Sequence, residues 1–573
     1  MYHSTFPTSP HLEAYLRSGR IISEHETAQD MVTRIVAALE HVDARFDPTG
    51  AAAFGERLGW ALDTERIVFS TPIMTNAGRH IDRPLAACAV PPVDLRGDLS
   101  QVKTIVDGYH RAGMGTGFNL DELDELDDPV GVLRYLNDIA VTGADSGTED
   151  RPVGNMAILS LDHPAAEEFI GCKLGADTRG EAWKFNVSLH VTDAQMRTAL
   201  GSPGRERDLL IAAAEAAHAC ADPGLMFADR MNEGNPTPEV GEYVSTAPCA
   251  EVGLVAGETC QFGYLNLGRF YAGDAFLPVD LDALAATTRI LVRALDDAIE
   301  ASLAHYPSPL SAQVMGTKRK IGVGVCGLAD LLLAAGLPYD SVEGRRLAQE
   351  VLTLVNYTSK LASVELARTR GGCPAVLGGR SRYADPAFLR RFADLEVDSV
   401  PRGDWAALAD QIASTGLLRN SSTIAVPPTG RSAPVVRAST GIEPLFRLSG
   451  DEPERPRADV LAALKAAGRT DVLGFVAGHG RLPADATLPE RLRAVLATAT
   501  QISSAGHLAM AAAVQACVDE AVSKTVNLPA SARSIDVYDT YATAFELGCK
   551  GITVYVDGSR SVQPQALATA TAR

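Results

Sequence analysis

Short segments with the pattern of β-strands alternate along the chain with longer segments that have helical periodicity. Residues 185–193 form the clearest strand pattern, because apolar residues occupy every second position. Residues 24–46 form the clearest helix pattern, and Thr27 with Asp30 predicts a capping box at its start. The other expected strands are 66–70, 260–270, 421–426 and 552–556, and the other expected helices are 284–304, 343–370 and 507–524. This alternation indicates an α/β domain built around a mostly parallel sheet or barrel.

The length and charge of the chain narrow the class of protein. A chain of 573 residues has room for three or four ordinary domains, or for one large catalytic barrel with an added region. The formal net charge of −19 argues against wrapping a nucleic-acid backbone or lying on an anionic membrane. No apolar run is long enough to span a bilayer, and the first residues lack the basic and apolar regions of a signal peptide. We therefore expect a soluble cytoplasmic enzyme that binds neither nucleic acid nor membrane.

The nine cysteines provide the strongest chemical pattern. They contain no C-x-x-C, which disfavours a zinc ribbon and a thioredoxin-like redox pair. Cys249 and Glu251 would face one ligand together on an extended segment, because residues i and i+2 share a face. Cys260 follows eleven residues after Cys249, although a buried structural thiol is the alternative for each cysteine. The histidines show no metal-ligand spacing, so we expect no metal ligands, and thiol and carboxylate chemistry assisted by a cofactor.

Three glycine-containing segments are candidates for binding a nucleotide or phosphate. Residues 322–327 match G-x-G-x-x-G, but Thr317–Lys320 replaces the apolar strand of a dinucleotide site, so tight helix–strand packing is the better interpretation. Residues 113–119 form a glycine cluster that suits either a close ligand or a turn. Residues 421–432 end a strand with Pro-Thr-Gly-x-Ser, whose N–H groups and hydroxyls are typical of an anion nest. A phosphate site is therefore expected at the last segment.

A series of motifs, spread over most of the chain, resembles the catalytic subunit of ribonucleotide reductase. The eleven-residue spacing from Cys249 to Cys260 and the segment GCKGITVYVDGSR at 548–560 are most similar to the adenosylcobalamin-dependent class II form, rather than the forms with a diiron subunit. The glycyl-radical form is disfavoured, because no Gly-Tyr radical loop stands near the end of the sequence. The other motifs are Ser70–Gly78, Ala86–Cys88, Gly115–Asn119, Phe185–Ser188, Ala247–Glu251, Gly257–Cys260, Arg319–Asp330, Pro428–Gly430, Gly441–Pro444 and Val522–Pro529.

The resemblance implies a fold and a division of the chain. The fold is an α/β, ten-stranded barrel of the ribonucleotide-reductase type, with a central finger loop and an N-terminal helical region. We assign residues 1–65 to the helical region, 66–560 to the catalytic barrel and 561–573 to a C-terminal tail. The segment 451–500 is rich in Pro, Arg, Asp and Ala and is expected to be an insertion on the surface of the barrel.

The resemblance also implies a role for each site residue. Cys249 corresponds to the thiyl-radical residue that takes hydrogen from the ribose C3′, and Glu251 to the general base for the 3′-hydroxyl. Cys88 and Cys260 correspond to the reducing pair that ends as a disulfide. Residues expected to bind the substrate, several of them at its phosphates, are Ser70, Thr71, Ala87, Gly115, Asn119, Ala247, Pro428, Thr429, Gly430, Arg431 and Ser432.

The cofactor and partners follow from the same resemblance. Adenosylcobalamin is the implied cofactor, and a ribonucleoside di- or triphosphate is the implied substrate. The tail after Arg560 has no cysteine, so an external dithiol, thioredoxin-like or small, is expected to reduce the site directly. The chain is expected to be a monomer or a homodimer.

Three departures from the family pattern leave other functions open. The family's Asn-Pro-Cys-Gly-Glu is here Ala247-Pro-Cys-Ala-Glu251, the usual serine two positions before the first redox cysteine is Ala86, and Arg431 follows the Pro-Thr-Gly motif. A radical enzyme acting on another nucleotide or nucleotide-sugar is therefore the first alternative. A non-catalytic binding protein is the second, which the three retained cysteines and Glu251 disfavour.

Overall fold

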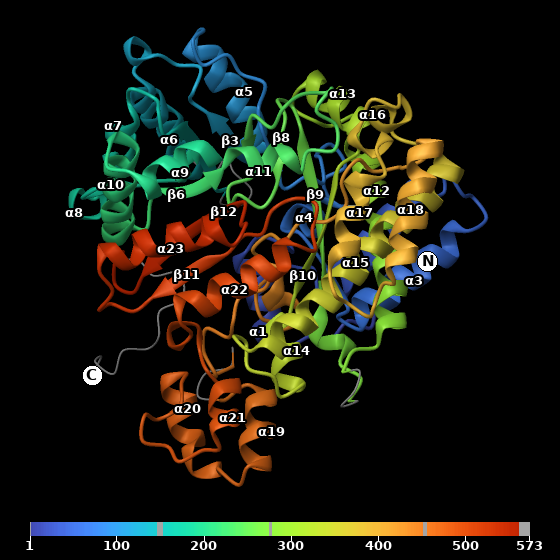
Figure 1. Ribbon diagram of the computed structural model, residues 1–573. Helices are drawn as coiled ribbons and strands as arrows, with labels where there is room; N and C mark the ends of the chain where they lie inside the picture. Colours follow the sequence, from blue (N-terminus) through green and yellow to red (C-terminus); the bar gives the residue numbers. More distant parts are fainter. Residues whose placement is uncertain (1, 146–152, 274–277, 451–454, 561–573) are drawn as a thin grey trace.

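A computed structural model describes residues 2–145, 153–273, 278–450 and 455–560 of the chain (Figure 1). The expected tail, 561–573, lies outside these residues. Within them, no helix combines the length and apolar character that crossing a membrane requires.

Ten strands form one mixed sheet around which the helices pack (Figure 1). Five neighbouring strands, β2 to β6, run parallel to one another, and antiparallel pairing joins them to β9 at one edge and to β12 at the other. The order is β1 (Ile67–Phe69), β9 (Thr259–Asn266), β2 (Cys88–Ala89), β3 (Gly115–Asn119), β4 (Asn155–Ser160), β5 (Phe185–Val191), β6 (Gly224–Phe227), β12 (Gly551–Val556) and β11 (Thr525–Leu528), with β10 (Ile321–Cys326) parallel to β9.

The extended segment 421–426 closes this sheet into a barrel. It forms single parallel bridges from Val323 of β10 to Ile424 and from Val426 to Val522, which lies three residues before β11. The pairing path therefore returns through β11 and β12 to β6, and the expected ten-stranded barrel is confirmed. The expectation of a regular strand at 421–426 is wrong, because the Asp519 carboxylate accepts the N–H groups of residues 423 and 424 and interrupts the ladder as a bulge does.

Most expected helices are present, with corrected ends. The helix expected at 24–46 is α2, and both bonds of the Thr27–Asp30 capping box are formed. The helix expected at 507–524 ends earlier, because the Glu520 and Ala521 N–H groups bond to carbonyls of the barrel and its loops instead. The longer helices are α1 (Pro10–Ser18), α2 (Ala28–Asp43), α3 (Ala51–Asp63), α5 (Leu99–Arg111), α6 (Pro129–Asp145), α9 (Asp193–Gly201), α10 (Arg205–Cys220), α12 (Leu281–Ser302), α13 (Pro309–Lys318), α15 (Val342–Arg370), α18 (Arg402–Thr415), α22 (Ser504–Gln515) and α23 (Ser534–Glu546).

Shorter helices connect these elements. The 3-10 helix η2 (Leu267–Phe270) continues β9, so the strand expected at 260–270 ends at Asn266. The remaining α-helices are α4 (Thr71–Asn76), α7 (Ala166–Gly171), α8 (Ala176–Arg179), α11 (Ala228–Glu233), α14 (Leu328–Ala334), α16 (Pro374–Leu377) and α17 (Ala387–Arg390), and further 3-10 helices are η1 (Glu125–Asp127), η3 (Arg382–Ala384), η4 (Arg391–Asp394), η5 (Ala433–Val436), η6 (Thr470–Val472) and η7 (Ala499–Gln501).

The segment expected to be a surface insertion folds into three helices at one end of the molecule (Figure 1). They are α19 (Ala458–Ala466), α20 (Leu473–His479) and α21 (Glu490–Val495). Buried side chains of α19 and α20 and partly buried ones of α21 form a small core with Ala329 and Leu333 of α14. An ion pair between Arg457 and Asp330 lies beside this core, so the three helices are attached to the barrel through α14.

A hairpin of β7 (Ser245–Thr246) and β8 (Gly253–Leu254) lies inside the ring of strands, and we call residues 245–254 the finger loop. A Cβ atom on Gly115 of β3 would lie 2.9 Å from Pro248, and one on Gly117 would overlap the Thr246 carbonyl oxygen. A Cβ atom on Gly551 of β12 would lie 3.9 Å from Ala250. The loop thus touches strands from distant places in the ring, which confirms the expected central finger.

Gly117→Ala tests this close approach. The added methyl group cannot fit without moving the finger loop, so we expect the free energy of unfolding to fall by about 1–3 kcal/mol. Equilibrium unfolding in urea measures it. Gly316→Ala on α13 is the control, because a Cβ atom there meets nothing within 4 Å and the free energy of unfolding should not fall. Equal effects of the two substitutions would contradict a tightly packed finger.

Candidate active site

Cys249 and Glu251 lie at the tip of the finger loop. The tip is held by the Ala247 N–H, which donates to the Val252 carbonyl at 3.0 Å, and by the Asn186 amide, which donates to the Pro248 carbonyl at 2.8 Å. Ala250, between the cysteine and the glutamate, has a φ of +59°. This left-handed conformation is unfavourable for a residue with a Cβ atom by about 1–2 kcal/mol, and glycine, which the related motif has at this place, adopts it freely.

Cys88 and Cys260 are direct partners across the antiparallel pair β2–β9. Directly opposed residues have Cβ atoms about 4.5–5.5 Å apart, and a disulfide needs about 3.5–4.5 Å. The two thiols can therefore form a disulfide after a small movement. Cys88 is 9% exposed, whereas Cys260 is fully buried.

The three cysteines and Glu251 form one cluster. Burial raises the pKa of the Cys249 thiol well above its usual value, and the charges of Glu251 and Cys88 raise it further. Burial likewise raises the pKa of Cys260, with Cys88 and Glu251 again among the groups that contribute. At neutral pH, Cys249 and Cys260 are therefore thiols that carry a hydrogen atom.

The Glu251 carboxyl has the properties of a proton acceptor. Burial raises its pKa to about 7, although the backbone N–H groups of Glu251 and Cys249 act in the opposite direction. The side chain is 3% exposed, and its Oε2 atom has no hydrogen-bond partner among the described residues. A carboxylate with a pKa near 7 and an open oxygen is suited to general base catalysis.

A buried charge cluster holds the base of the finger loop; it consists of Tyr243, Glu258, Lys318, Lys320 and Glu520. Lys320 donates to the Gly253 carbonyl at 2.6 Å, and Glu520 accepts the Gly253 N–H at 3.3 Å. Lys320 also forms ion pairs with Glu520 at 3.1 Å and with Glu258 at 3.5 Å. Sequence reasoning missed this cluster, and the one available signal was the occurrence of lysines directly before an apolar strand.

The expected substrate-binding residues of the barrel fall into two places. Ala87, Gly115 and Ala247 lie beside the cysteine cluster, since the Ala87 N–H donates to the Cys260 carbonyl and the Gly115 N–H to the Ala87 carbonyl, both at 3.0 Å. Asn119 lies at the other end of β3, and its side chain accepts the Asp121 N–H at 2.9 Å.

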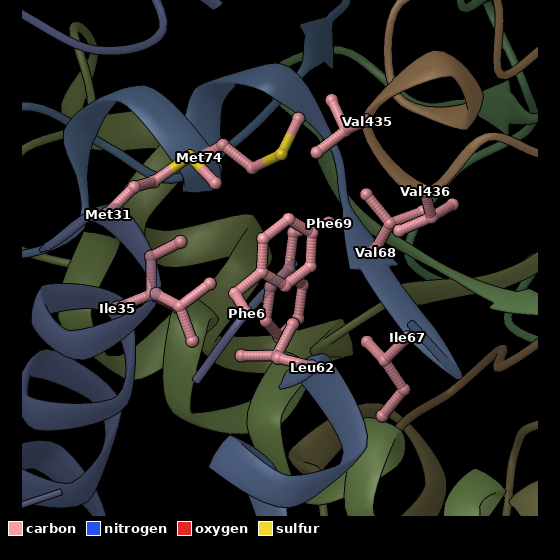
Figure 2. A pocket seen from close by; sticks show the side chains of 11 residues that line it. Phe6, Met31, Ile35, Leu62, Ile67, Val68, Phe69, Met74, Val435 and Val436 are labelled. Atoms are coloured by element: carbon pink, nitrogen blue, oxygen red, sulfur yellow. The ribbon is translucent and has the colours of Figure 1, made fainter. Parts of the chain in front are cut away.

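The other expected substrate-binding residues, among them the expected phosphate contacts Thr71 and 429–432, come from two segments that lie close together. Ser70 and Thr71 begin α4, and residues 428–432 lead into η5. Figure 2 shows α4 and η5 facing each other across an apolar cavity of about 10 Å³, which Met74, Val435 and Val436 help to line. The cavity is too apolar to hold a polar ligand and belongs to the core. It lies between α4 and η5, and we call residues 428–432, which precede η5, the phosphate loop.

The phosphate loop has an ordered backbone and open polar side chains. Thr429 accepts the N–H of Ser432 at its carbonyl and that of Gly441 at its hydroxyl, while Pro428 and Gly430 are exposed. The buried Arg431 Nη1 and Ser70 hydroxyl have no hydrogen-bond partner among the described residues. The Tyr15 hydroxyl of α1 donates to the Arg431 carbonyl at 3.0 Å. A cation and a hydroxyl left open in this way can bind an anion.

In the parts of the chain that the structure describes, no three His, Cys, Asp or Glu side chains form a group suited to hold a metal ion. The glycines of the 322–327 motif lie in β10 and at the start of α14. A Cβ atom on Gly324 would lie 2.9 Å from both Pro427 and Tyr264, so these glycines allow close packing of strands.

Glu251→Gln tests the raised pKa of Glu251. Because the folded-state pKa of about 7 exceeds the ordinary 4.5, ionisation of Glu251 costs stability as the pH rises between these values. The quantity compared is the free energy of unfolding of Glu251→Gln minus that of the wild type. We expect this difference to be about 2–3 kcal/mol more favourable to the variant at pH 8 than at pH 5. Urea unfolding at both pH values measures this difference.

Glu258→Gln is the matched control. Although burial alone would raise the pKa of Glu258, Lys318 and Lys320 hold it below its usual value. The carboxyl is then ionised at both pH 5 and pH 8, and the effect of the control should be equal at both. A pH-independent effect of Glu251→Gln as well would contradict the raised pKa.

Comparison with known proteins agrees with this arrangement. The family described as "Ribonucleotide reductase, barrel domain" matches residues 204–555. A vitamin B12-dependent ribonucleoside-diphosphate reductase of Mycobacterium tuberculosis is 33% identical over 96% of this chain and 79% of its own length. A protein of the same description from Thermoplasma acidophilum is 30% identical over 91% of this chain and 67% of its own length.

A solved structure supports the fold independently of close sequence similarity. The alpha subunit of the class Id ribonucleotide reductase of Actinobacillus ureae superposes with a TM-score of 0.77 at 16% identity, over 97% of this chain and 99% of that subunit. The closed ten-stranded barrel, the central finger and the family match over the barrel lead to one conclusion: this chain belongs to the ribonucleotide reductase family.

Proposed function

We propose that this protein reduces the 2′-hydroxyl of a ribonucleotide through a thiyl radical on Cys249, with adenosylcobalamin as the radical initiator. The observation that carries the proposal is that Cys249 and Glu251 of the fingertip form one cluster with Cys88 and Cys260 of the strand pair β2–β9. Relatives at 30–33% identity are described as vitamin B12-dependent reductases, which supports the choice of cofactor.

Each member of the cluster has a task in this reaction. The Cys249 sulfur, as a radical, takes the hydrogen atom from C3′, while the Glu251 carboxylate accepts the proton of the 3′-hydroxyl. Cys88 and Cys260 supply the two electrons and protons that replace the 2′-hydroxyl by hydrogen. One water leaves, and the pair ends as a disulfide. Cys249 returns the hydrogen atom to C3′, and Glu251 returns the proton to the 3′-oxygen.

The site fits a radical initiator that approaches from outside the finger loop. Cys249 is partly exposed at the tip, and its raised pKa keeps the S–H bond intact until an initiator acts on it. When bound, adenosylcobalamin supplies a carbon-centred radical strong enough to take this hydrogen atom. The residues of the chain have the tasks of presenting the sulfur and excluding water from it.

The phosphate loop and the start of α4 are the proposed site for the substrate's phosphates. Arg431 supplies a cation, and Ser70 and Thr71 supply hydroxyl and backbone donors, so a ribonucleoside di- or triphosphate fits their chemistry. An external dithiol is the proposed reductant. The chain's oligomeric state, monomer or homodimer, stays a prediction.

A second candidate substrate is a modified nucleotide or a nucleotide-sugar. The observation that favours it is the fully buried methyl group of Ala247, where the related motif has an asparagine amide that orients the base and the sugar hydroxyls. This second candidate therefore differs from the main proposal only in the substrate, and the radical is still on Cys249.

The decisive experiment combines the protein with adenosylcobalamin, dithiothreitol and a panel of ribonucleoside di- and triphosphates and nucleotide-sugars. We expect 2′-deoxyribonucleotides, identified by mass, and hydrogen exchange into 5′-deoxyadenosine. Cys249→Ser should abolish both, because an alcohol O–H bond is too strong to replace the thiol. The same substitution at the buried Cys549, which lies outside the cluster, should leave both intact.

Three other results would each change the proposal. Turnover without the cobalamin, supported by a diiron partner, would refute the choice of initiator. Product formed only from a nucleotide-sugar would favour the second candidate. Activity that survives Cys249→Ser would refute the radical site itself.

Arg431→Ala tests the phosphate site. Losing a charge-assisted hydrogen bond costs about 1.5–3 kcal/mol, so KM for phosphorylated substrate should rise by roughly 10- to 150-fold with little change in kcat. The increase should be larger for the triphosphate than for the diphosphate. Arg431→Lys should recover part of the affinity, and Arg402→Ala, at the exposed start of α18, should have no effect. An unchanged KM for both nucleotides would mean that Arg431 does not contact the phosphates.

A further inference from the structure

Lys320, directly before β10, lies beside Cys260 of the neighbouring strand β9. In the parallel pair β9–β10, Ile321 is opposite Gln261, so the residues just before them, Lys320 and Cys260, stand at the same level. A Cβ atom on Gly322 would lie 3.3 Å from the Cys260 sulfur, so this sulfur covers the Gly322 position. Residues 320 and 322 point to the same face of the strand. The Lys320 side chain therefore starts on the face that the Cys260 sulfur covers.

The Lys320 ammonium group is buried and charged. The side chain is fully buried and donates to the Gly253 carbonyl at 2.6 Å and to the Tyr243 hydroxyl at 3.0 Å. Although burial alone would lower the pKa of Lys320, Glu258, Glu520 and Cys260 together raise it above its usual value. A positive charge is thus held permanently at the base of the finger loop.

The two sulfurs of the redox pair differ in access. Cys88 is 9% exposed and Cys260 is fully buried, so a dithiol from solution reaches Cys88 first. Thiolate attack on a disulfide is faster when the leaving sulfur is better stabilised as a thiolate. The sulfur that leaves after attack on Cys88 is Cys260, the one that stands beside Lys320.

We propose that Lys320 stabilises the Cys260 thiolate released when the disulfide between Cys88 and Cys260 is reduced, and so directs the reductant to Cys88. This inference rests on the proposed function, because the disulfide forms only if the two cysteines are the reducing pair. Lys320 thereby has two tasks, anchoring the Gly253 backbone and assisting regeneration of the site.

The electron balance of this step is that of thiol–disulfide exchange. A reductant thiolate attacks Cys88, forming a mixed disulfide and releasing Cys260 as a thiolate next to Lys320. The second thiolate of the dithiol then attacks its own sulfur in the mixed disulfide, releasing Cys88 and closing the reductant's disulfide. The dithiol is oxidised by two electrons, and the two cysteines take up two protons from water.

The other charges near Cys260 make the lysine necessary. Burial raises the pKa of Cys260, and Cys88, Glu520 and Glu251 raise it further, whereas Lys320 lowers it. Without the ammonium group, a Cys260 thiolate would face carboxylates in a buried site, and its release would be strongly unfavourable.

The test measures the reduction of the disulfide directly. The protein is oxidised by one turnover with substrate, and its reduction by dithiothreitol is followed by thiol release from pH 6 to 9. We expect Lys320→Met to slow reduction by roughly tenfold or more and to move the pH profile toward higher pH. Lys320→Arg, which keeps the charge, should recover most of the rate. In the wild type, a monothiol should be trapped on Cys88, as peptide mass shows.

Lys318→Met is the matched control. Lys318 is equally buried and belongs to the same charge cluster, but it lies on α13 and donates to Glu258 at 2.9 Å. It should leave the reduction rate within about threefold of the wild type. If Lys320→Met alone does not fold, the double variant Lys320→Met with Glu520→Gln replaces it in the test. The double variant removes both charges of an ion pair and so leaves no unpaired buried charge. Its reduction should be slow as well.

Two failures can be told apart. If one turnover produces no disulfide between Cys88 and Cys260, the proposed function is refuted before Lys320 is tested. If the disulfide forms but the folded Lys320 variants are reduced at the wild-type rate, or the monothiol is trapped on Cys260, the role of Lys320 is refuted and the proposed function stands.

Discussion

The finger loop depends on one buried ion pair, Lys320 with Glu520. A hairpin with only two residues in each strand has too few backbone hydrogen bonds to hold a fixed position inside a barrel. Lys320 and Glu520 supply further bonds, because Lys320 donates to the Gly253 carbonyl and Glu520 accepts the Gly253 N–H. The next residue, Ala521, donates its N–H to the Glu251 carbonyl at 2.9 Å. The position of the carboxyl and of Cys249 therefore follows from charges that lie outside the tip.

The tip itself works against stability. Ala250 has a left-handed backbone, and Glu251 is buried with a pKa near 7, so both raise the free energy of the folded state. Packing at the tip requires neither the left-handed backbone of Ala250 nor the carboxyl group of Glu251. Strain and a destabilised carboxyl at the same turn are typical of a site where reactivity is maintained at a cost in stability.

Local patterns in the sequence predicted four of the ten strands, β1, β5, β9 and β12, and the helices α2, α12, α15 and α22, because elements with one buried face have a periodicity that does not depend on distant residues. The closed barrel itself was expected from the family resemblance. The strand at 185–191 and the Thr27 capping box are examples. The segment 421–426 was not predicted correctly, since a carboxylate from residue 519 takes its N–H groups. The Lys320–Glu520 pair was missed for the same reason: its partners meet only after the ring has closed, and each alone resembles an ordinary surface charge.

The hydrogen bond from Tyr15 to the Arg431 carbonyl joins residues that are 416 positions apart. The first helix leaves the ribosome long before the loop that it contacts has been synthesised, and contacts of such high sequence separation form late in folding. The N-terminal helices must therefore wait for most of the barrel before they can cover it. A chain that is still being made does not have a complete phosphate loop, so under the proposed function it cannot yet hold a nucleotide for reaction at Cys249.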